Sequence, residues 1–296
     1  MLNIKEAQSN NIVQIVGVLS ELDIEEKVTA DKRGYITGKA IIKVEQEVDG
    51  EVVENEVPVK MFSMRLKKDG TKNAVYDSIL KMKEDFTSLA AADNPSQASR
   101  VSVTKGQLQE NNWVDQSTGQ VRNSFQISSN FINKAKADEE QKATFELSGV
   151  IGSMKEETDK EGVETGNLLI KFIIIGYGGR AEVVQLVAKS SAAVNHIQNH
   201  WNEGDTVKLT GIVNMTYKTV TWEEEQGFGE PIKRTKTIST RELIIKSGSQ
   251  TGLDEEESYD SDSIKIALDE RAGRIAELTN KAKKPAPSKS KIDVGF

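Results

Sequence analysis

The chain has 296 residues, of which 36% are hydrophobic and 29% charged, and 46 acidic against 39 basic side chains give a formal net charge of −7. This composition is typical of a soluble globular protein, and at about 100–200 residues per domain the length indicates two domains. The lack of cysteine excludes disulfide frameworks, zinc ribbons and cysteine nucleophiles. The longest apolar run, residues 168–175, contains Lys171 and is far shorter than the roughly 20 residues that span a bilayer. Since the amino terminus also lacks the apolar core of a secretion signal, we expect an intracellular protein without a membrane segment.

Two stretches of the chain read alike when the second is shifted back by 132 residues. Gly17 then aligns with Gly149 and Lys39 with Lys171, and both stretches read as an apolar strand, a charged connection and a second strand. The sequence therefore suggests an internal repeat.

The first half continues with alternating apolar residues at 57, 59 and 61, which predict a strand, and with a turn at 67–70. The next apolar residues recur at intervals of four and three, on one face of a helix: Val75, Ile79, Met82, Phe86 and Leu89. After a break at 94–96, strands are predicted around 101–103 and 125–127.

The second half repeats this order. Residues 182–188 predict a strand and residues 191–202 a helix. After a turn at 204–205, two further strands are predicted at 207–211 and 238–245. Each half thus reads strand, strand, strand, helix, strand, strand.

This order is that of a five-stranded Greek-key barrel with its helix between the third and fourth strands, the OB fold. Residues 204–211, GDTVKLTG, and the helix before them resemble the helix-to-fourth-strand region of single-stranded DNA-binding proteins with this fold. The resemblance covers residues 143–250 and, more loosely, residues 1–142. It implies a mainly β protein with two tandem OB barrels over these two ranges, each with one helix, and a flexible tail over residues 251–296.

Within that tail, the acidic run at 254–262 is typical of a disordered linker, and apolar residues at helical spacing over 264–278 predict a short amphipathic helix. The acidic run has a second interpretation, in which it folds over a basic groove when no strand is bound. Residues 281–291 are basic, contain proline and predict a linker.

The last five residues, IDVGF, are similar to the acidic tip through which bacterial single-stranded DNA-binding proteins dock partner enzymes. The similarity implies docking of replication or recombination proteins through Asp293, Val294 and Phe296. The alternative is an ordinary disordered end.

Single-strand binding needs cations for phosphates and flat rings on which bases stack. The densest such set lies between the last two predicted strands and predicts a nucleic-acid contact: Tyr217, Lys218, Trp222, Phe228, Lys233, Arg234 and Lys236. The alternative is a solvated hairpin, indicated by three glutamates at 223–225, whose rings fold back onto the barrel.

Two smaller sets are further candidates. The glycine-rich turn at 176–180 offers Tyr177 and Arg180, or is a plain hairpin turn. In the first half, Lys60 and Phe62 share one strand face and are the preferred pair.

Trp113 and Arg122 are also candidates in the first half, with core packing as the alternative for Trp113. One hairpin departs from the expected pattern, because it carries six carboxylates around residues 49–50: Glu45, Glu47, Asp49, Glu51, Glu54 and Glu56. Phosphate would be repelled there, so either this hairpin points away from the nucleic acid or the first half serves protein contact.

Two catalytic or metal-binding signals are set aside. Residues 67–70, KKDG, match a four-residue ligase motif, but a charged turn explains them. His196 and His200 have the spacing of a metal pair, but they are the only histidines and a surface helix explains them. We therefore predict no cofactor, no metal and no enzyme activity.

The predicted function is non-catalytic binding of single-stranded DNA with little sequence preference, to coat and protect it during replication or recombination. Size, lack of cysteine and two-module layout are similar to phage-encoded or bacterial single-stranded DNA-binding proteins, which implies the cytoplasm of a bacterium or an infected host. The alternative is a non-enzymatic protein-interaction or virion-assembly module built on the same barrels.

Overall fold

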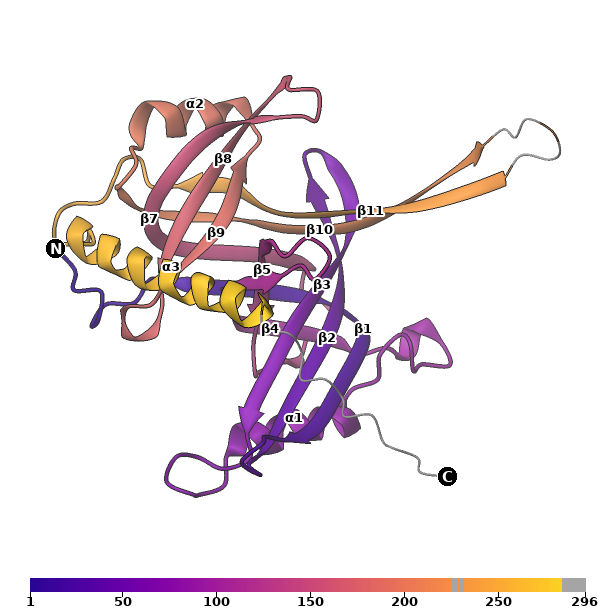
Figure 1. Cartoon of the computed structure of the whole chain (residues 1–296). Coiled ribbons are helices and arrows are strands. Elements are labelled where there is room, and N and C mark those ends of the chain that lie inside the picture. Colours follow the sequence, from indigo (N-terminus) through magenta and orange to yellow (C-terminus); the bar gives the residue numbers. More distant parts are fainter. Residues whose placement is uncertain (225–227, 229–231, 284–296) are drawn as a thin grey trace, which may run out of the picture.

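The computed structural model describes residues 1–224, 228 and 232–283, and the chain is mainly β (Figure 1). The first half contains β1 (Asn11–Val28), β2 (Gly34–Val48), β3 (Glu51–Met64), α1 (Ala74–Asp85), the short turn η1 (Pro95–Gln97), β4 (Arg100–Val114), β5 (Val121–Ser128) and the two-residue β6 (Asn133–Lys134). The second half contains β7 (Lys142–Thr158), β8 (Glu164–Ile175), the turn η2 (Tyr177–Gly179), β9 (Ala181–Ala188), α2 (Ser191–His200), β10 (Thr206–Glu224) and β11 (Ile232–Gly248). A last helix, α3 (Ser261–Lys283), follows. The predicted order of strands and helices in the two halves is confirmed.

The strand pairings close into two five-membered rings. In the first, β1 pairs with β2, β2 with β3, β3 with β5 in parallel, β5 with β4, and β4 returns to β1. The second follows the same path from β7 through β8, β9, β11 and β10 back to β7. We call these the first ring and the second ring.

The two rings are not separate, which corrects the expectation of two independent tandem barrels. Residues 11–16 of β1 pair with residues 142–147 of β7, so that one continuous 11-stranded sheet runs through the whole molecule. The predicted boundary between residues 142 and 143 falls at the start of β7.

The 132-residue repeat is visible in the geometry of the strands. A β-bulge interrupts the β1–β2 pairing between Leu19 and Glu21, and another interrupts the β7–β8 pairing between Ile151 and Ser153, at equivalent positions. The aligned Gly17 and Gly149 are required for the same reason. A Cβ at residue 17 would lie 2.2 Å from the carbonyl oxygen of Lys43, and a Cβ at residue 149 would lie 2.3 Å from that of Ile173. A neighbouring strand therefore passes too close for any side chain at either position.

The main core is a single cluster of buried side chains that spans both rings, with Ile15 of β1 and Phe145 and Leu147 of β7 among its members. The N-cap of helix α1 is Asn73, whose side chain accepts a hydrogen bond from the Val75 amide, and the helix buries Tyr76, Ile79 and Met82. It ends before Phe86, one turn earlier than the predicted apolar face.

The acidic β2–β3 hairpin packs against the second ring. Asp49 lies 3.7 Å from Lys189 and 3.5 Å from Lys246, and Val48 is buried against Val187 and Ile244. Deeper in the hairpin, the fully buried Asn55 accepts a 2.6 Å hydrogen bond from the Met215 amide. The tip of this hairpin is therefore turned to a contact within the chain, and both predicted alternatives for its role stay predictions.

The segment after β11 differs from the predicted disordered linker. Residues 254–257 form turns, Tyr259 is buried, and Leu2 forms a β-bridge with Tyr259. The helix α3 is longer than the predicted amphipathic helix, and its residues Ile264 and Ala267 pack in a second apolar cluster with Ile4 and Ile175. Asp293, Val294 and Phe296, which the sequence predicts to dock partners, lie outside the described residues.

Candidate nucleic-acid interface

An open groove lies on the outer side of the first ring, where β3, β4 and β5 run side by side. Lys60 and Phe62 point into it from β3, while Met61 between them is buried in the core. Lys105, Gln107 and Gln109 line it from β4, and Gln126 and Ser128 from β5. The predicted pair on β3 thus shares one solvent-facing surface.

The groove has a volume of about 590 Å³ and presents two phenyl rings to solvent. Phe62 is 55% exposed and Phe131, which follows β5, is 54% exposed. Asn130 fixes the approach of these two segments, because its side chain accepts a 2.9 Å hydrogen bond from the Phe62 amide. Tyr35 lies beside Phe62 with ring centroids 5.6 Å apart. Rings held at a surface in this way suit base stacking.

The charge of the groove differs from that of the whole chain. Lys60 and Lys105 are among its lining residues, and none of the lining residues is acidic. The Lys60 ammonium donates a 2.6 Å hydrogen bond to the Gln126 side chain, which in turn donates to Gln109. Lys39 is the cross-strand neighbour of Lys60. Within the described residues, no carboxylate forms an ion pair with these lysines, so they remain available to phosphate.

The same surface continues along the hairpin of β4 and β5. Gln107 pairs with Ser128, Gln109 with Gln126 and Trp113 with Arg122, in an unbroken register. Because side chains alternate between the faces of a strand, Trp113 and Arg122 share the face of the groove residues. Six residues separate Gln107 from Trp113, which is about 20 Å along a strand. We call the surface from Phe62 to Trp113 the strip.

Asp115 shapes the end of the strip. Its carboxylate accepts hydrogen bonds from the side chain and the amide of Ser117, and these bonds hold the pKa of Asp115 at about 2. Arg122 approaches the same carboxylate at 3.4 Å. The guanidinium of Arg122 is therefore partly neutralised, whereas Trp113, at 44% exposure, is open to solvent.

The second predicted set lies on an arm formed by the distal parts of β10 and β11, which projects from the body (Figure 1). Cross-strand pairing divides the set between two faces. One face carries the pairs Lys218–Ile238, Val220–Lys236 and Trp222–Arg234, and the other carries Tyr217–Ser239, Thr219–Thr237 and Glu223–Lys233. A nucleic-acid strand that lies on one face of the arm would contact only part of the predicted set.

Arg234 on this arm forms a 2.6 Å ion pair with Glu224. Trp222 is 45% exposed, so its ring does not fold back onto the body as the alternative reading required. Phe228, at the tip, is exposed, and its neighbours at 225–227 and 229–231 lie outside the described residues.

Tyr177 and Arg180 lie apart from both surfaces, in and just after η2 at the end of β8. Tyr177 is exposed, and Arg180 lies 3.9 Å from Glu182. Burial raises the pKa of Glu182, with smaller opposing effects from an amide hydrogen bond and from Arg180. The structure does not bring this pair together with the strip.

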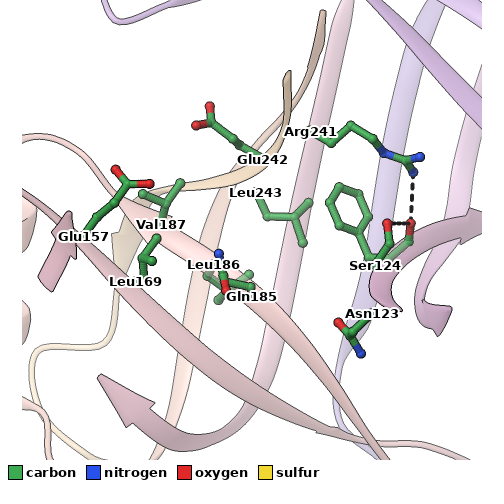
Figure 2. Close-up of a pocket in the computed structure, with 11 residues that line it drawn as sticks. Asn123, Ser124, Glu157, Leu169, Gln185, Leu186, Val187, Arg241, Glu242 and Leu243 are labelled. Atoms are coloured by element: carbon green, nitrogen blue, oxygen red, sulfur yellow. Dashed lines mark hydrogen bonds between the residues drawn. The ribbon is translucent and has the colours of Figure 1, made fainter. Parts of the chain in front are cut away.

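A polar pocket of about 330 Å³ separates the β4–β5 hairpin from the second ring (Figure 2). Arg241 of β11 donates a 3.0 Å hydrogen bond to the Phe125 carbonyl oxygen, and its guanidinium lies 5.5 Å from the centroid of the Phe125 ring. Glu242, on the other side, pairs with Lys189 at 2.8 Å. This pocket lies between the two rings, and we call it the seam.

Phe131, Lys105 and the glutamines of the groove are not among the residues predicted from the sequence. Alternation within β4 and β5 would have placed Lys105, Gln107 and Gln126 on one face, but Phe131 lies outside any strand and carries no such signal. No group of three or more potential metal ligands occurs among the described residues, and none of the helices they form is long and apolar enough to cross a membrane.

Comparisons with known proteins give a family and similar solved structures. The wild-type single-stranded DNA-binding protein of Thermus aquaticus is 12% identical, with 87% of this chain and 99% of that chain covered and a TM-score of 0.49. A deletion mutant of the same protein is 11% identical, with 83% and 97% covered and a TM-score of 0.49. No curated protein sequence matches the chain. The sequence model of the YorF family matches residues 9–281, which is nearly the whole chain, and the protein therefore belongs to the YorF family.

Proposed function

We propose that the protein binds single-stranded DNA without catalysis, along the strip on the first ring. The observation that carries the proposal is the composition of the groove: two exposed phenyl rings and two lysines, with no carboxylate among the lining residues of a chain with net charge −7. Such a surface attracts phosphates and stacks bases. The proposal includes the view that each five-stranded ring is an OB barrel, since OB barrels bind oligonucleotides across the second and third strands and the adjoining loops.

The proposed binding has little sequence preference, because stacking on a ring does not read the edges of a base. The amides of Gln107, Gln109 and Gln126 can exchange hydrogen bonds with any base. Coating and protection of single strands during replication or recombination would follow from such binding, with partners recruited through the tail at residues 292–296.

The arm adds a second proposed contact. Its face with Lys218, Trp222 and Lys236 combines one ring with cations, and it extends the surface available to a strand. The exposed aliphatic side chains Val220, Ile232 and Ile238 on that same face favour a different partner, an apolar protein surface. Replacing the arm beyond Thr216 and Thr240 by a short turn separates the two roles. If the arm contacts DNA, the affinity for single-stranded DNA should fall; if it contacts a protein, that affinity should not change.

The proposal is tested by fluorescence anisotropy with a labelled single-stranded oligonucleotide at about 50 and 200 mM salt, the range over which counterion release is large. Each phosphate contact contributes about 0.7 to the slope of log affinity against log salt concentration for single strands. The double variant Lys60→Gln, Lys105→Gln should therefore lower that slope by about 1.4.

A matched control has the same loss of charge elsewhere. Lys160→Gln, Lys265→Gln changes exposed residues of the second ring and α3, and it should leave the slope unchanged. Affinity that is equal at the two salt concentrations, or equal for duplex and single strand, would overturn the proposal.

A further inference from the structure

The β4–β5 hairpin has an inner face opposite the strip. There, Glu110 pairs directly with Phe125 across the two strands. The neighbouring pair Gln109–Gln126 faces outward into the groove. Whatever holds Glu110 and Phe125 therefore sets the position of the part of the hairpin beyond this pair, which carries Trp113 and Arg122.

Glu110 is held by α3. The Arg271 guanidinium donates hydrogen bonds to both carboxylate oxygens of Glu110, with its Nε 2.8 and 3.0 Å from them. The Glu110 side chain is only 7% exposed, so this pair is largely shielded from solvent. Burial by itself raises the pKa of Glu110, but the hydrogen bonds from Arg271 and Asn112 outweigh it and leave the pKa lowered. The bidentate geometry fixes direction as well as distance.

The second ring adds two contacts to the same cross-strand pair. The Glu110 amide donates a 2.9 Å hydrogen bond to Glu182 of β9. The Phe125 carbonyl oxygen accepts a 3.0 Å hydrogen bond from Arg241 of β11. Both strands of the hairpin are thus held at one point along their length.

The repeat explains why the second ring provides this support. Thr37 corresponds to Leu169, 132 residues later, and the cross-strand partner of Thr37, Phe62, corresponds to the partner of Leu169, Val187. Phe62 is 55% exposed, whereas Val187 is 5% exposed and packs in a cluster with Val48 of the acidic hairpin. Likewise Lys60 corresponds to Gln185, which borders the seam. The equivalent face of the second ring has Val187 in place of the aromatic Phe62 and Gln185 in place of Lys60. This face contacts the first ring instead of solvent.

We propose that α3 and the second ring hold the β4–β5 hairpin in position, and that Arg271 is a positioning residue for single-strand binding. The inference rests on the proposed function. Arg271 does not touch the strand; through Glu110 it keeps the hairpin at the angle that aligns Trp113 with the groove at Phe62. The groove itself, formed mainly by β3 and the proximal parts of β4 and β5, does not depend on this contact.

The test compares oligothymidylates of two lengths, about 4 and about 12 nucleotides, within the range of site sizes known for OB folds. In the full-length Arg271→Ala chain, affinity for the long oligonucleotide should fall about tenfold, the effect of losing one stacked base. Affinity for the short oligonucleotide, which the groove holds alone, should not change. Because removing Arg271 leaves a shielded carboxylate without its partner, Glu110→Gln provides a second variant in which the side-chain volume is kept, and the same pattern is expected.

Lys265→Ala is the control. It removes the same charge from the same helix, but Lys265 is exposed and forms no hydrogen bond or ion pair with the hairpin or with β9 within the described part of the chain. Its affinity for both lengths should equal that of the unchanged chain. In addition, Arg271→Ala should have no further effect in a Trp113→Ala chain, because both changes remove the same contact.

An equal loss of affinity for both oligonucleotide lengths in Arg271→Ala would show a general loss of charge or structure and would overturn the proposed role of Arg271. No weakening for either length would do the same. If the unchanged chain binds neither length, the proposed function itself fails, which is a different result from either of these.

Discussion

In the proposed function, Phe62 contributes to binding of single-stranded DNA and little to stability. Its ring is half exposed and contacts Tyr35 at the edge of the groove. We predict that Phe62→Ala lowers the affinity for single-stranded DNA by about tenfold, since stacking is worth about 1–3 kcal/mol per base. The free energy of unfolding should change by less than about 1 kcal/mol. Anisotropy titration and urea denaturation measure the two quantities.

Phe62→Tyr is the matched control, because it keeps a ring of the same size at the same place. It should retain the affinity of the unchanged chain. A loss as large in Phe62→Tyr as in Phe62→Ala would exclude stacking as the role of this ring.

For Gly17 and Gly149, in contrast to Phe62, we predict that substitution lowers stability. A Cβ at either position would lie within about 2.3 Å of a carbonyl oxygen on the neighbouring strand. Gly17→Ala and Gly149→Ala should each reduce the free energy of unfolding by about 1–3 kcal/mol, as overpacking does in other cores. Urea denaturation measures the change.

Gly273 provides the comparison for this pair. It lies in the exposed middle of α3, with no atom within 4 Å of an added Cβ. Gly273→Ala should stabilise the chain by up to about 1 kcal/mol through helix propensity. If Gly17→Ala were equally harmless, the close approach of the strands would not exist in solution.

The acidic hairpin is the element whose role the sequence left open. Of the carboxylates that would repel phosphate, Asp49 lies near Lys189 and Lys246 of the second ring, and Asn55 of the same hairpin is buried against β10. Such contacts between segments more than 130 residues apart leave no periodic signal in the sequence. The strands themselves were predictable, because alternation and turn residues are local.

Asn55→Ala tests this docking. It leaves the buried Met215 amide without an acceptor, and we expect the free energy of unfolding to fall by about 1–3 kcal/mol. Asp49→Asn should cost less than about 1 kcal/mol, since its ion pairs are partly exposed. Thermal denaturation of the two variants provides the comparison, and a larger loss in Asp49→Asn than in Asn55→Ala would contradict this ranking.

Other elements were predictable only in part. The helical face of residues 75–82 is confirmed, but α1 ends at Asp85 because Phe86 adopts an extended backbone. The predicted last strand, 238–245, is part of a longer β11 whose first residues extend into the arm with no core beneath them. Apolar periodicity marks only the buried part of such a strand. For the same reason Lys60 and Phe62 were found from the sequence, whereas Phe131, in a connection without periodicity, was not.

At the scale of the whole molecule, the rings share backbone pairing between β1 and β7 and one apolar core. We predict that they unfold together. In a chain with Trp113→Phe and Trp222→Phe, the buried Trp201 alone reports on the second ring, while far-ultraviolet circular dichroism reports on both. The two thermal transitions should coincide. Two separate transitions would show that the rings are independent domains, as the sequence alone suggested.

The most direct test of single-strand binding on the first ring uses Trp113 as its own probe. In a Trp222→Phe chain, Trp113 is the exposed tryptophan and Trp201 is buried with its indole nitrogen donating to the Ser249 carbonyl oxygen. Titration with an unstructured single-stranded oligonucleotide should quench the fluorescence, strongly at low salt and weakly at high salt, whereas duplex of the same length should not. Binding without any quenching would place the strand away from the strip, and no binding at low salt would contradict the proposed function.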